Sequence, residues 1–226
     1  MKAMVAIPAY NEEKNIFSVV EAVKFHHPEV DVVVINDGSR DNTGLEAQRA
    51  GAFVINLRQN LGIGGAVQTG YIYAKKKGYD AVIQIDGDGQ HNPKDLSKML
   101  DAIGKDKVDM VIGSRFVKKT DYKSSSMRKL GINFFSSFVS FVCKEDLHDT
   151  TSGYRAVNKK VIELFSRYYP RDYPEVETIV YASKRGIRIK EISVDMDKRQ
   201  GGKSSITPIK SIYYMIKVTC AILLQP

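Results

Sequence analysis

The chain reads Ile83-Gln84-Ile85-Asp86-Gly87-Asp88-Gly89-Gln90-His91 near its centre, where an apolar run ends in two carboxylates. The run, residues 81–85, has the length of a buried strand. Alternate side chains of extended backbone point to one face, so Asp86 and Asp88 are expected to meet at a common point. Two hard oxygen ligands beside small glycines suit Mg²⁺ or Mn²⁺ shared with substrate phosphates. Asp-Gly is also a hairpin-turn signal, so this segment alone leaves a turn open as the alternative.

Apolar runs and helix-spaced apolar residues alternate around this segment. Strands are predicted at residues 2–9, 31–36, 52–56, 81–85 and 110–113, and helices at 14–24, 62–77 and 93–103, with another after the turn at 37–43. This order predicts an α/β fold with a mostly parallel sheet and helices on both faces. Ligands of such sheets bind beyond the carboxyl ends of the strands. The polar residues expected at that rim are Tyr10, Asn11, Asp37, Asn60, Asp86, Asp88, Ser114 and Arg115.

The second half of the sequence is less regular. Residues 118–126 predict a polar loop, residues 128–142 a very apolar helix, and residues 158–168 and 173–184 two further helices. Between them lies the polar patch Asp149-Thr150-Thr151-Ser152-Gly153-Tyr154-Arg155. Residues 188–196 alternate in polarity as an antiparallel strand does. Residues 198–205 predict a basic, glycine-rich loop. This loop and the polar patch are the segments of the second half that are expected at a site.

Composition bounds the class of protein without choosing a partner. The 226 residues carry a formal net charge of +8, and 43% are hydrophobic, enough for the core of one globular domain. The positive charge favours nucleotides, phospholipid headgroups or nucleic acid as partners. Two cysteines in apolar segments, Cys143 and Cys220, do not make a disulfide framework and favour a reduced, intracellular setting. Met1-Lys2 leads directly into the first predicted strand, so no secretory signal is expected.

Five short motifs occur in order along the chain. They are Pro8-Ala9-Tyr10-Asn11-Glu12-Glu13, Asn36-Asp37-Gly38-Ser39-Arg40-Asp41, Asp86-Gly87-Asp88-Gly89-Gln90-His91, Gly113-Ser114-Arg115-Phe116 and Asp149-Thr150-Thr151-Ser152-Gly153-Tyr154-Arg155. With these motifs the chain resembles family 2 glycosyltransferases of the Rossmann-like GT-A fold. Within that family it is most similar to the dolichyl- and polyprenyl-phosphate sugar transferases. Each motif alone is weak, but the five together extend over most of the chain.

The resemblance implies roles for individual residues. The residues expected to hold the base and ribose of a nucleotide-sugar donor are Pro8, Tyr10, Glu12 and Asp37. Asp86 and Asp88 correspond to the family's DXD pair, which holds Mg²⁺ or Mn²⁺ at the donor phosphates, and Gln90 corresponds to a residue that assists at the metal. A metal at this place neutralises the departing nucleoside diphosphate.

The acceptor determines what the other side chains must do. A polyprenyl phosphate is already anionic and needs positioning and charge compensation, whereas a sugar hydroxyl needs a base. The resemblance makes Arg115, Arg128 and Arg199 the candidates for holding an anionic acceptor. Arg199 and Lys203 lie in a segment that resembles the family's Arg-x-x-Gly-x-Ser loop, which closes over the site and meets phosphate. Asp149 is expected in the site, either as a base for a hydroxyl or as a residue that orients its neighbours.

Simpler explanations exist for some of these features. Asp37 alternatively caps the helix that follows its turn. Gly62-Ile63-Gly64-Gly65 superficially resembles a dinucleotide-binding loop, but it follows the third predicted strand and lacks the spaced acid that would bind a ribose. His91 follows the predicted metal ligands; it is interpreted as a neighbour that supports them and is left out of the predicted site.

The end of the chain differs from the rest. Residues 1–205 are expected to form the catalytic domain, and residues 206–226 an amphipathic C-terminal helix. Its apolar core of about 13 residues is shorter than the roughly 20 needed to span a bilayer. The helix is expected to lie on a membrane surface, with packing on the domain's own sheet and truncation of a longer chain as alternatives. The expected location is cytoplasmic, peripheral on the cytoplasmic face of the membrane, held directly or by a separate membrane protein.

The predicted function is inverting, metal-dependent transfer of a hexose or N-acetylhexosamine from a UDP- or GDP-sugar to undecaprenyl or dolichyl phosphate, in cell wall polysaccharide biosynthesis. The nearest alternative transfers the sugar to a hydroxyl of a cell-surface polysaccharide. A nucleotidyltransferase is more distant, because residues 8–13 are acidic where that class has a basic, glycine-rich loop. Nucleic acid is not an expected partner, because the basic residues are scattered rather than gathered with aromatic residues on one face.

Overall fold

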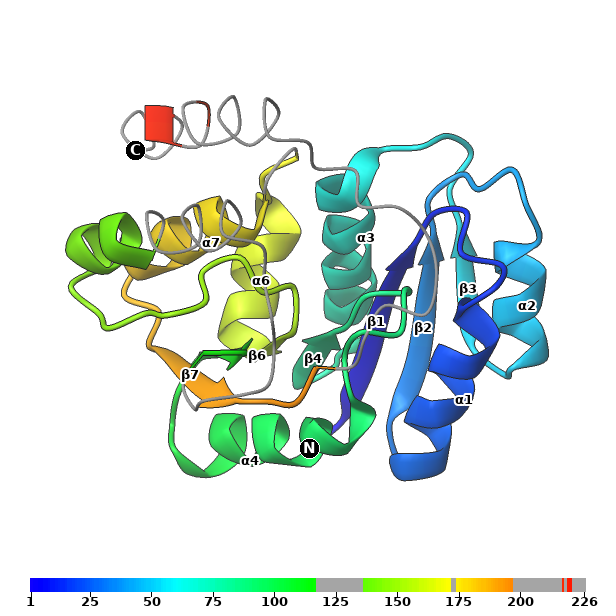
Figure 1. Cartoon of the computed structure of the whole chain (residues 1–226), viewed down its shortest axis with the longest axis horizontal. Coiled ribbons are helices and arrows are strands. Elements are labelled where there is room, and N and C mark those ends of the chain that lie inside the picture. Colours follow the sequence, from blue (N-terminus) through cyan, green and yellow to red (C-terminus); the bar gives the residue numbers. More distant parts are fainter. Residues whose placement is uncertain (117–135, 172–173, 197–216, 218, 221–226) are drawn as a thin grey trace.

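The computed structural model describes residues 1–116, 136–171, 174–196, 217 and 219–220, which form a sheet with helices on both faces (Figure 1). The sheet has seven strands in the order β3-β2-β1-β4-β6-β5-β7. The strands are β1 (Ala3–Ala9), β2 (Asp31–Asn36), β3 (Phe53–Asn56), β4 (Ala81–Gln84), β5 (Met110–Ser114), β6 (Arg155–Asn158) and β7 (Ile189–Ser193). Neighbouring strands are parallel except at β6, which runs against β4 and β5. The predicted α/β fold with a mostly parallel sheet is confirmed.

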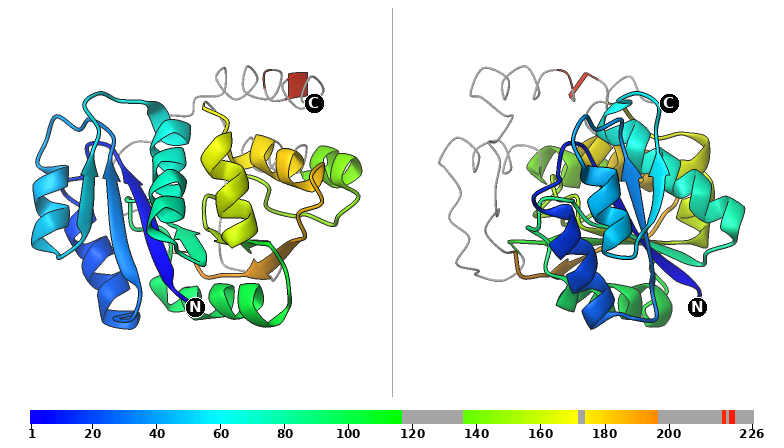
Figure 2. Two further views of the ribbon diagram at one scale, coloured as in Figure 1. Left: turned by 180° about the vertical axis from the view of Figure 1, so that it is seen from behind. Right: turned by 90° about the vertical axis from the view of Figure 1, so that its right-hand side faces the viewer.

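Apolar side chains point away from both faces of the sheet, because successive residues of a strand point in opposite directions. The helices are α1 (Ile16–His26), α2 (Thr43–Arg49), α3 (Gly62–Lys77), η1 (Pro93–Asp95), α4 (Leu96–Lys105), α6 (Lys159–Arg167) and α7 (Pro174–Ser183), and residues 136–143 are also helical. Met4 and Ala6 of β1 belong to the core shared with α3, α6 and α7, whereas Val5 and Ile7 belong to the core shared with α1, α2 and α4. Figure 2 shows these two layers from behind and from the side.

The second half corrects two expectations. No strand is predicted at residues 155–158, yet they form β6, which is only four residues long and contains the buried charge of Arg155. Residues 188–196 are predicted as an antiparallel strand, and this direction is wrong, because β7 lies parallel to β5. Polarity alternates there because β7 is an edge strand whose outer residues stay partly exposed.

Some predicted segments lie outside the described residues. Residues 136–143 are helical within the predicted helix 128–142, whose first part is not described. Of the predicted C-terminal helix, the described residues 217, 219 and 220 are helical. The loops predicted at 118–126 and 198–205, and with them the domain boundary at residue 205, also lie outside the described part.

The direction of β6 determines which residues reach the functional rim of the sheet. For the parallel strands, the rim holds the residues that follow each strand, such as Tyr10 after β1 and Asp86 after β4. For β6, which runs in reverse, it holds the residues that precede the strand, namely the polar patch 149–154. One reversed strand therefore brings that patch beside the two acids of the central segment.

Gly64 in the first turn of α3 explains the glycine-rich sequence at residues 62–65. A Cβ on Gly64 would lie 2.1 Å from the carbonyl oxygen of Pro170, and the Gly64 N–H donates to the carbonyl oxygen of Arg171 at 3.2 Å. Only a residue without a side chain permits this approach. Close packing of α3 against residues 170–171 thus accounts for Gly64 without a dinucleotide.

Candidate active site

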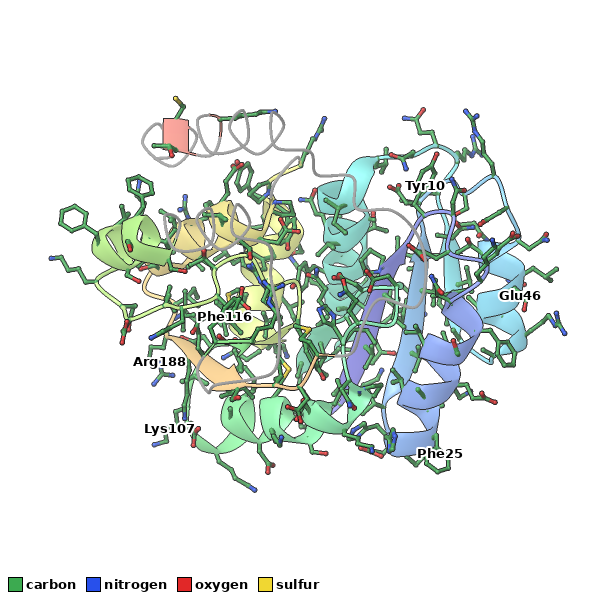
Figure 3. All side chains as sticks on the ribbon, viewed as in Figure 1. Tyr10, Phe25, Glu46, Lys107, Phe116 and Arg188 are labelled. Atoms are coloured by element: carbon green, nitrogen blue, oxygen red, sulfur yellow. The ribbon has the colours of Figure 1, made fainter. Side chains whose placement is uncertain are left out.

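The loops after β1 and β2 form one side of the rim. They are joined by five hydrogen bonds: Asn11 N–H to Ser39 Oγ (3.0 Å), Glu12 N–H to Thr43 Oγ1 (2.7 Å), Glu13 N–H to Asp41 (3.2 Å), Arg40 N–H to Asn11 Oδ1 (2.9 Å) and Asn42 N–H to Glu13 (3.1 Å). Tyr10 is 44% exposed beside them, at the end of the molecule opposite Phe25 (Figure 3). The five bonds make the two loops a fixed platform beneath an accessible aromatic ring.

The residues expected to hold a base and ribose are placed differently from one another. Pro8 is buried in β1, and the Glu12 carboxylate accepts a hydrogen bond from the Asn15 side chain at 2.7 Å. Asp37 is 3% exposed, and its two oxygens accept the N–H groups of Leu61 (2.7 Å) and Gly62 (3.0 Å). Asp37 therefore holds the start of α3, a later helix than the one its alternative capping role named.

Asp86 and Asp88 lie at the carboxyl end of β4. The Asp86 side chain is 39% exposed and lines a pocket of about 110 Å³ together with Gln90, His91, Arg115, Thr151, Ser152, Gly153 and Met196. Asp88 is 8% exposed, and its Oδ1 accepts the N–H of Gln90 at 3.1 Å. Gly153 lies so close that a Cβ there would be 3.1 Å from Asp86 Oδ1. The pocket therefore joins the central segment to the polar patch.

The chemistry of these side chains fits a metal ion shared with a ligand. Among the described residues no three His, Cys, Asp or Glu side chains gather into a complete metal cage. Mg²⁺ does not need one, since it is usually held by one or two carboxylates together with substrate phosphates and water. Asp86 offers an accessible carboxylate and Gln90 lines the same pocket, whereas Asp88 is buried next to them and is not part of the pocket lining.

Arg115 and Asp149 form a buried ion pair at the other side of the pocket. Arg115 Nε donates to Asp149 Oδ2 and Nη2 to Oδ1, each at 2.7 Å, and the Arg115 backbone N–H adds a third bond at 3.1 Å. Asp149 is 0% exposed, and the Arg115 side chain is 12% exposed. Such a two-pronged pair is strong and fixes the plane of the guanidinium. Arg115 lines the pocket, whereas the Asp149 carboxylate is buried behind the Arg115 side chain.

A second buried carboxylate supports this pair. Glu191 of β7 accepts the N–H groups of Asp149 (2.8 Å) and His148 (3.0 Å). Burial raises the pKa of Glu191 above its ordinary value. Sequence reasoning does not single out Glu191, because only the fold brings β7 against residues 148–149.

Arg155 holds the polar patch from behind. The residue is 1% exposed, and its guanidinium donates to the carbonyl oxygen of Ser152 (2.9 Å), to Thr178 Oγ1 (2.5 Å) and to the carbonyl oxygen of Glu175. These bonds tie the patch to α7. The charge of Arg155 thus serves the position of the loop rather than the open pocket.

His91 and Met196 complete the pocket and are also absent from the predicted site. His91 is 7% exposed, and burial lowers its pKa to about 4, so its ring is neutral near pH 7. Met196 follows β7 and pairs with His91 through an antiparallel β-bridge. The predicted Arg128, Arg199 and Lys203 lie outside the described residues.

No helix in the described ranges combines the length and the apolar character that crossing a membrane requires.

Comparisons with known proteins match the chain to a family and to individual relatives. Residues 4–165 match the family described as glycosyl transferase family 2. The polyprenol monophosphomannose synthase of Mycolicibacterium smegmatis is 29% identical over 96% of this chain and 85% of its own. The UDP-N-acetylglucosamine–dolichyl-phosphate N-acetylglucosaminyltransferase of Methanococcus voltae is 31% identical over 83% of this chain and 82% of its own.

A likeness in fold extends to solved structures. Glucosyl-3-phosphoglycerate synthase from Mycobacterium tuberculosis, crystallised with Mn²⁺, uridine diphosphate and phosphoglyceric acid, has a TM-score of 0.75 at 18% identity, covering 99% of this chain and 77% of that one. The same enzyme with Mg²⁺ and uridine diphosphate gives 0.75 at 20% identity, covering 99% and 78%.

Proposed function

We propose that this chain, which belongs to glycosyl transferase family 2, transfers a hexose or N-acetylhexosamine from a nucleoside-diphosphate sugar to polyprenyl phosphate. The transfer is proposed to invert the anomeric carbon. The chain is a glycosyltransferase related to polyprenyl-phosphate sugar transferases. The sugar, the nucleotide, the lipid acceptor, the metal ion and the inversion are proposed.

The observation that carries the proposal is the Arg115–Asp149 pair. A hydroxyl acceptor needs a base that reaches its proton. Asp149, the candidate base, is fully buried with both oxygens bonded to Arg115. Arg115 instead presents positive charge to the pocket that Asp86 lines. A cation held rigidly beside that pocket suits an acceptor that arrives as an anion and needs charge compensation rather than deprotonation.

Asp86, Asp88 and Gln90 would hold the divalent ion, Mg²⁺ or Mn²⁺, at the donor phosphates. When bound, the ion neutralises charge on the departing nucleoside diphosphate. The chain's own residues fix the geometry, since β4 sets the position of Asp86 and the patch 149–153 packs against it. Glucosyl-3-phosphoglycerate synthase crystallises with either ion and uridine diphosphate, which supports the same use of metal here.

The donor nucleotide would lie on the platform formed by the loops after β1 and β2. Tyr10 offers an exposed ring for the base, while Pro8, Glu12 and Asp37 define the floor and the start of α3 behind it. Arg128, Arg199 and Lys203 are proposed to meet the phosphates, by family resemblance alone. The protein is proposed to act at the cytoplasmic face of a membrane, with residues 206–226 as the proposed contact.

A donor screen tests the proposal. Purified protein is mixed with Mn²⁺ or Mg²⁺, short-chain polyprenyl phosphate and a panel of radiolabelled UDP-, GDP- and dTDP-sugars. One donor is expected to place label in the organic phase only when the lipid phosphate is present. No label in the organic phase with any donor, or release of nucleoside diphosphate that does not depend on the lipid, would overturn the lipid acceptor.

Gly153→Ala tests the contact between the patch and Asp86. The new methyl group would lie 3.1 Å from the Asp86 carboxylate, so the carboxylate must move. We expect Mn²⁺ binding about tenfold weaker, as when a supporting group of a metal ligand is lost. Titration with Mn²⁺ measures this. Gly104→Ala on α4 is the matched control, since its Cβ would meet no atom within 4 Å and binding should not change. Unchanged binding in Gly153→Ala would separate Asp86 from the metal.

A further inference from the structure

We propose that His91 is a positioning residue that holds Asp86 in the orientation in which its carboxylate meets the metal. This role rests on the proposed metal function of Asp86. His91 follows the acidic segment directly in sequence, is buried, and has no place among the groups that bind donor or acceptor.

The imidazole contacts Asp86 at two places. His91 Nδ1 accepts the backbone N–H of Asp86 at 2.9 Å, and Nε2 lies 3.6 Å from Asp86 Oδ2. Because Nδ1 accepts a hydrogen bond, it carries no proton, and the ring proton resides on Nε2. Nε2 lies beyond hydrogen-bond distance of the carboxylate but close enough to attract it, so the ring holds the Asp86 backbone by a hydrogen bond and the Asp86 side chain by electrostatic attraction. A supporting group of this kind fixes the direction in which a ligand's lone pairs point.

His91 is itself held on several sides. Its ring stacks on the fully buried ring of Tyr154, with centroids 4.8 Å apart and an interplanar angle of 19°. The Tyr154 hydroxyl donates to the carbonyl oxygen of Asn92 at 3.0 Å, next to His91 in the chain. The backbone of His91 pairs with that of Met196, and both residues line the pocket. Tyr154 immediately precedes the reversed strand β6, so the position of Asp86 depends on that strand through the imidazole.

A purely structural histidine would behave differently. His27 is the other buried histidine of the described residues, with Nε2 2.9 Å from the carbonyl oxygen of Pro93 and Nδ1 3.4 Å from Glu29. Losing a buried imidazole should reduce stability at either position. Only at position 91 should it also reduce the affinity of the folded protein for metal.

The test measures Mn²⁺ binding by EPR of the free ion, without donor or acceptor, in His91→Phe, His91→Asn and His27→Phe. Phe keeps a ring against Tyr154 but provides neither nitrogen. Asn places Oδ1 at the same bonded position as Nδ1 and so keeps an acceptor for the Asp86 N–H. We expect the Mn²⁺ dissociation constant to rise about tenfold in His91→Phe and about threefold in His91→Asn, and to stay at the wild-type value in His27→Phe. Circular dichroism confirms that each variant is folded.

The outcomes separate this inference from the proposed function. Folded His91→Phe with wild-type Mn²⁺ affinity, while the wild-type protein binds Mn²⁺, would overturn the role of His91 alone. Wild-type protein that binds no Mn²⁺, with or without uridine diphosphate, would overturn the metal role and the role of His91 together. If His91→Phe does not fold, His91→Asn decides, and wild-type affinity in that variant would also overturn the role.

Discussion

Asp86→Asn is expected to lower kcat/KM for sugar transfer by about 10³-fold, a loss of roughly 4 kcal/mol in transition-state stabilisation. The substitution keeps the shape of the side chain and its neighbours Gly153 and His91 but removes the charge that would bind the metal. The side chain is 39% exposed at the pocket, so the fold should tolerate the amide. Steady-state transfer to short-chain polyprenyl phosphate over a range of Mn²⁺ concentrations measures the effect.

The matched control for this variant is Asp101→Asn. Asp101 is an exposed acid of α4 whose carboxylate lies 3.0 Å from Lys105 Nζ, and its loss should leave transfer unchanged. Excess Mn²⁺ should recover part of the activity of Asp86→Asn if weaker metal binding is the cause. Wild-type activity in Asp86→Asn, or activity of the wild-type protein that persists in EDTA, would remove Asp86 from the mechanism.

The first half of the fold follows from the sequence because its signals are local. Residues 32–35 of β2 are all β-branched, and the strand lies where the pattern predicts. Asn92 caps the helical segment that begins at Pro93 by accepting the N–H of Lys94 at 3.1 Å. The strands of the second half are harder to predict from the sequence, because they depend on tertiary pairing. β6 contains Arg155, whose guanidinium bonds to Thr178 on another segment. The direction of β7 is set only by its pairing with β5. Periodicity records exposure, not strand direction.

The site divides in the same way. Asp86, Asp88 and Gln90 stand in one segment, so their proximity can be read from the chain. Asp37 accepts hydrogen bonds from residues 24 and 25 positions away. Asp149 bonds to Arg115, which lies 34 positions away. The strand pattern predicts Asp37 at the rim and the family resemblance predicts Asp149 in the site, but neither indicates that Asp37 holds α3 and that Asp149 holds Arg115. Glu191 lies 42 positions from Asp149 and gives no signal in the sequence.

Breaking the Arg115–Asp149 pair should have the largest effect on stability. Arg115→Met removes the cation that pairs with the fully buried Asp149 carboxylate, and Asp149→Leu removes the carboxylate that pairs with the guanidinium, which keeps its bond to Thr151. Each is expected to lower the free energy of unfolding by about 3–5 kcal/mol, the usual cost of an uncompensated buried charge. Urea denaturation measures this. Lys190→Met, which breaks the exposed pair with Asp106, is the control and should cost less than about 1 kcal/mol.

The double variant Arg115→Met/Asp149→Leu separates the two functions of the pair. Replacing a buried ion pair by apolar residues of similar size is often neutral, so most of the lost stability should return. Transfer to polyprenyl phosphate should remain at least about 10²-fold below wild type, because the cation that compensates the acceptor's charge is gone. A stable double variant with wild-type transfer would mean that the pair serves only the fold. A stable but inactive one would place Arg115 at the acceptor, since restored packing without restored charge leaves the chemistry as the only missing part.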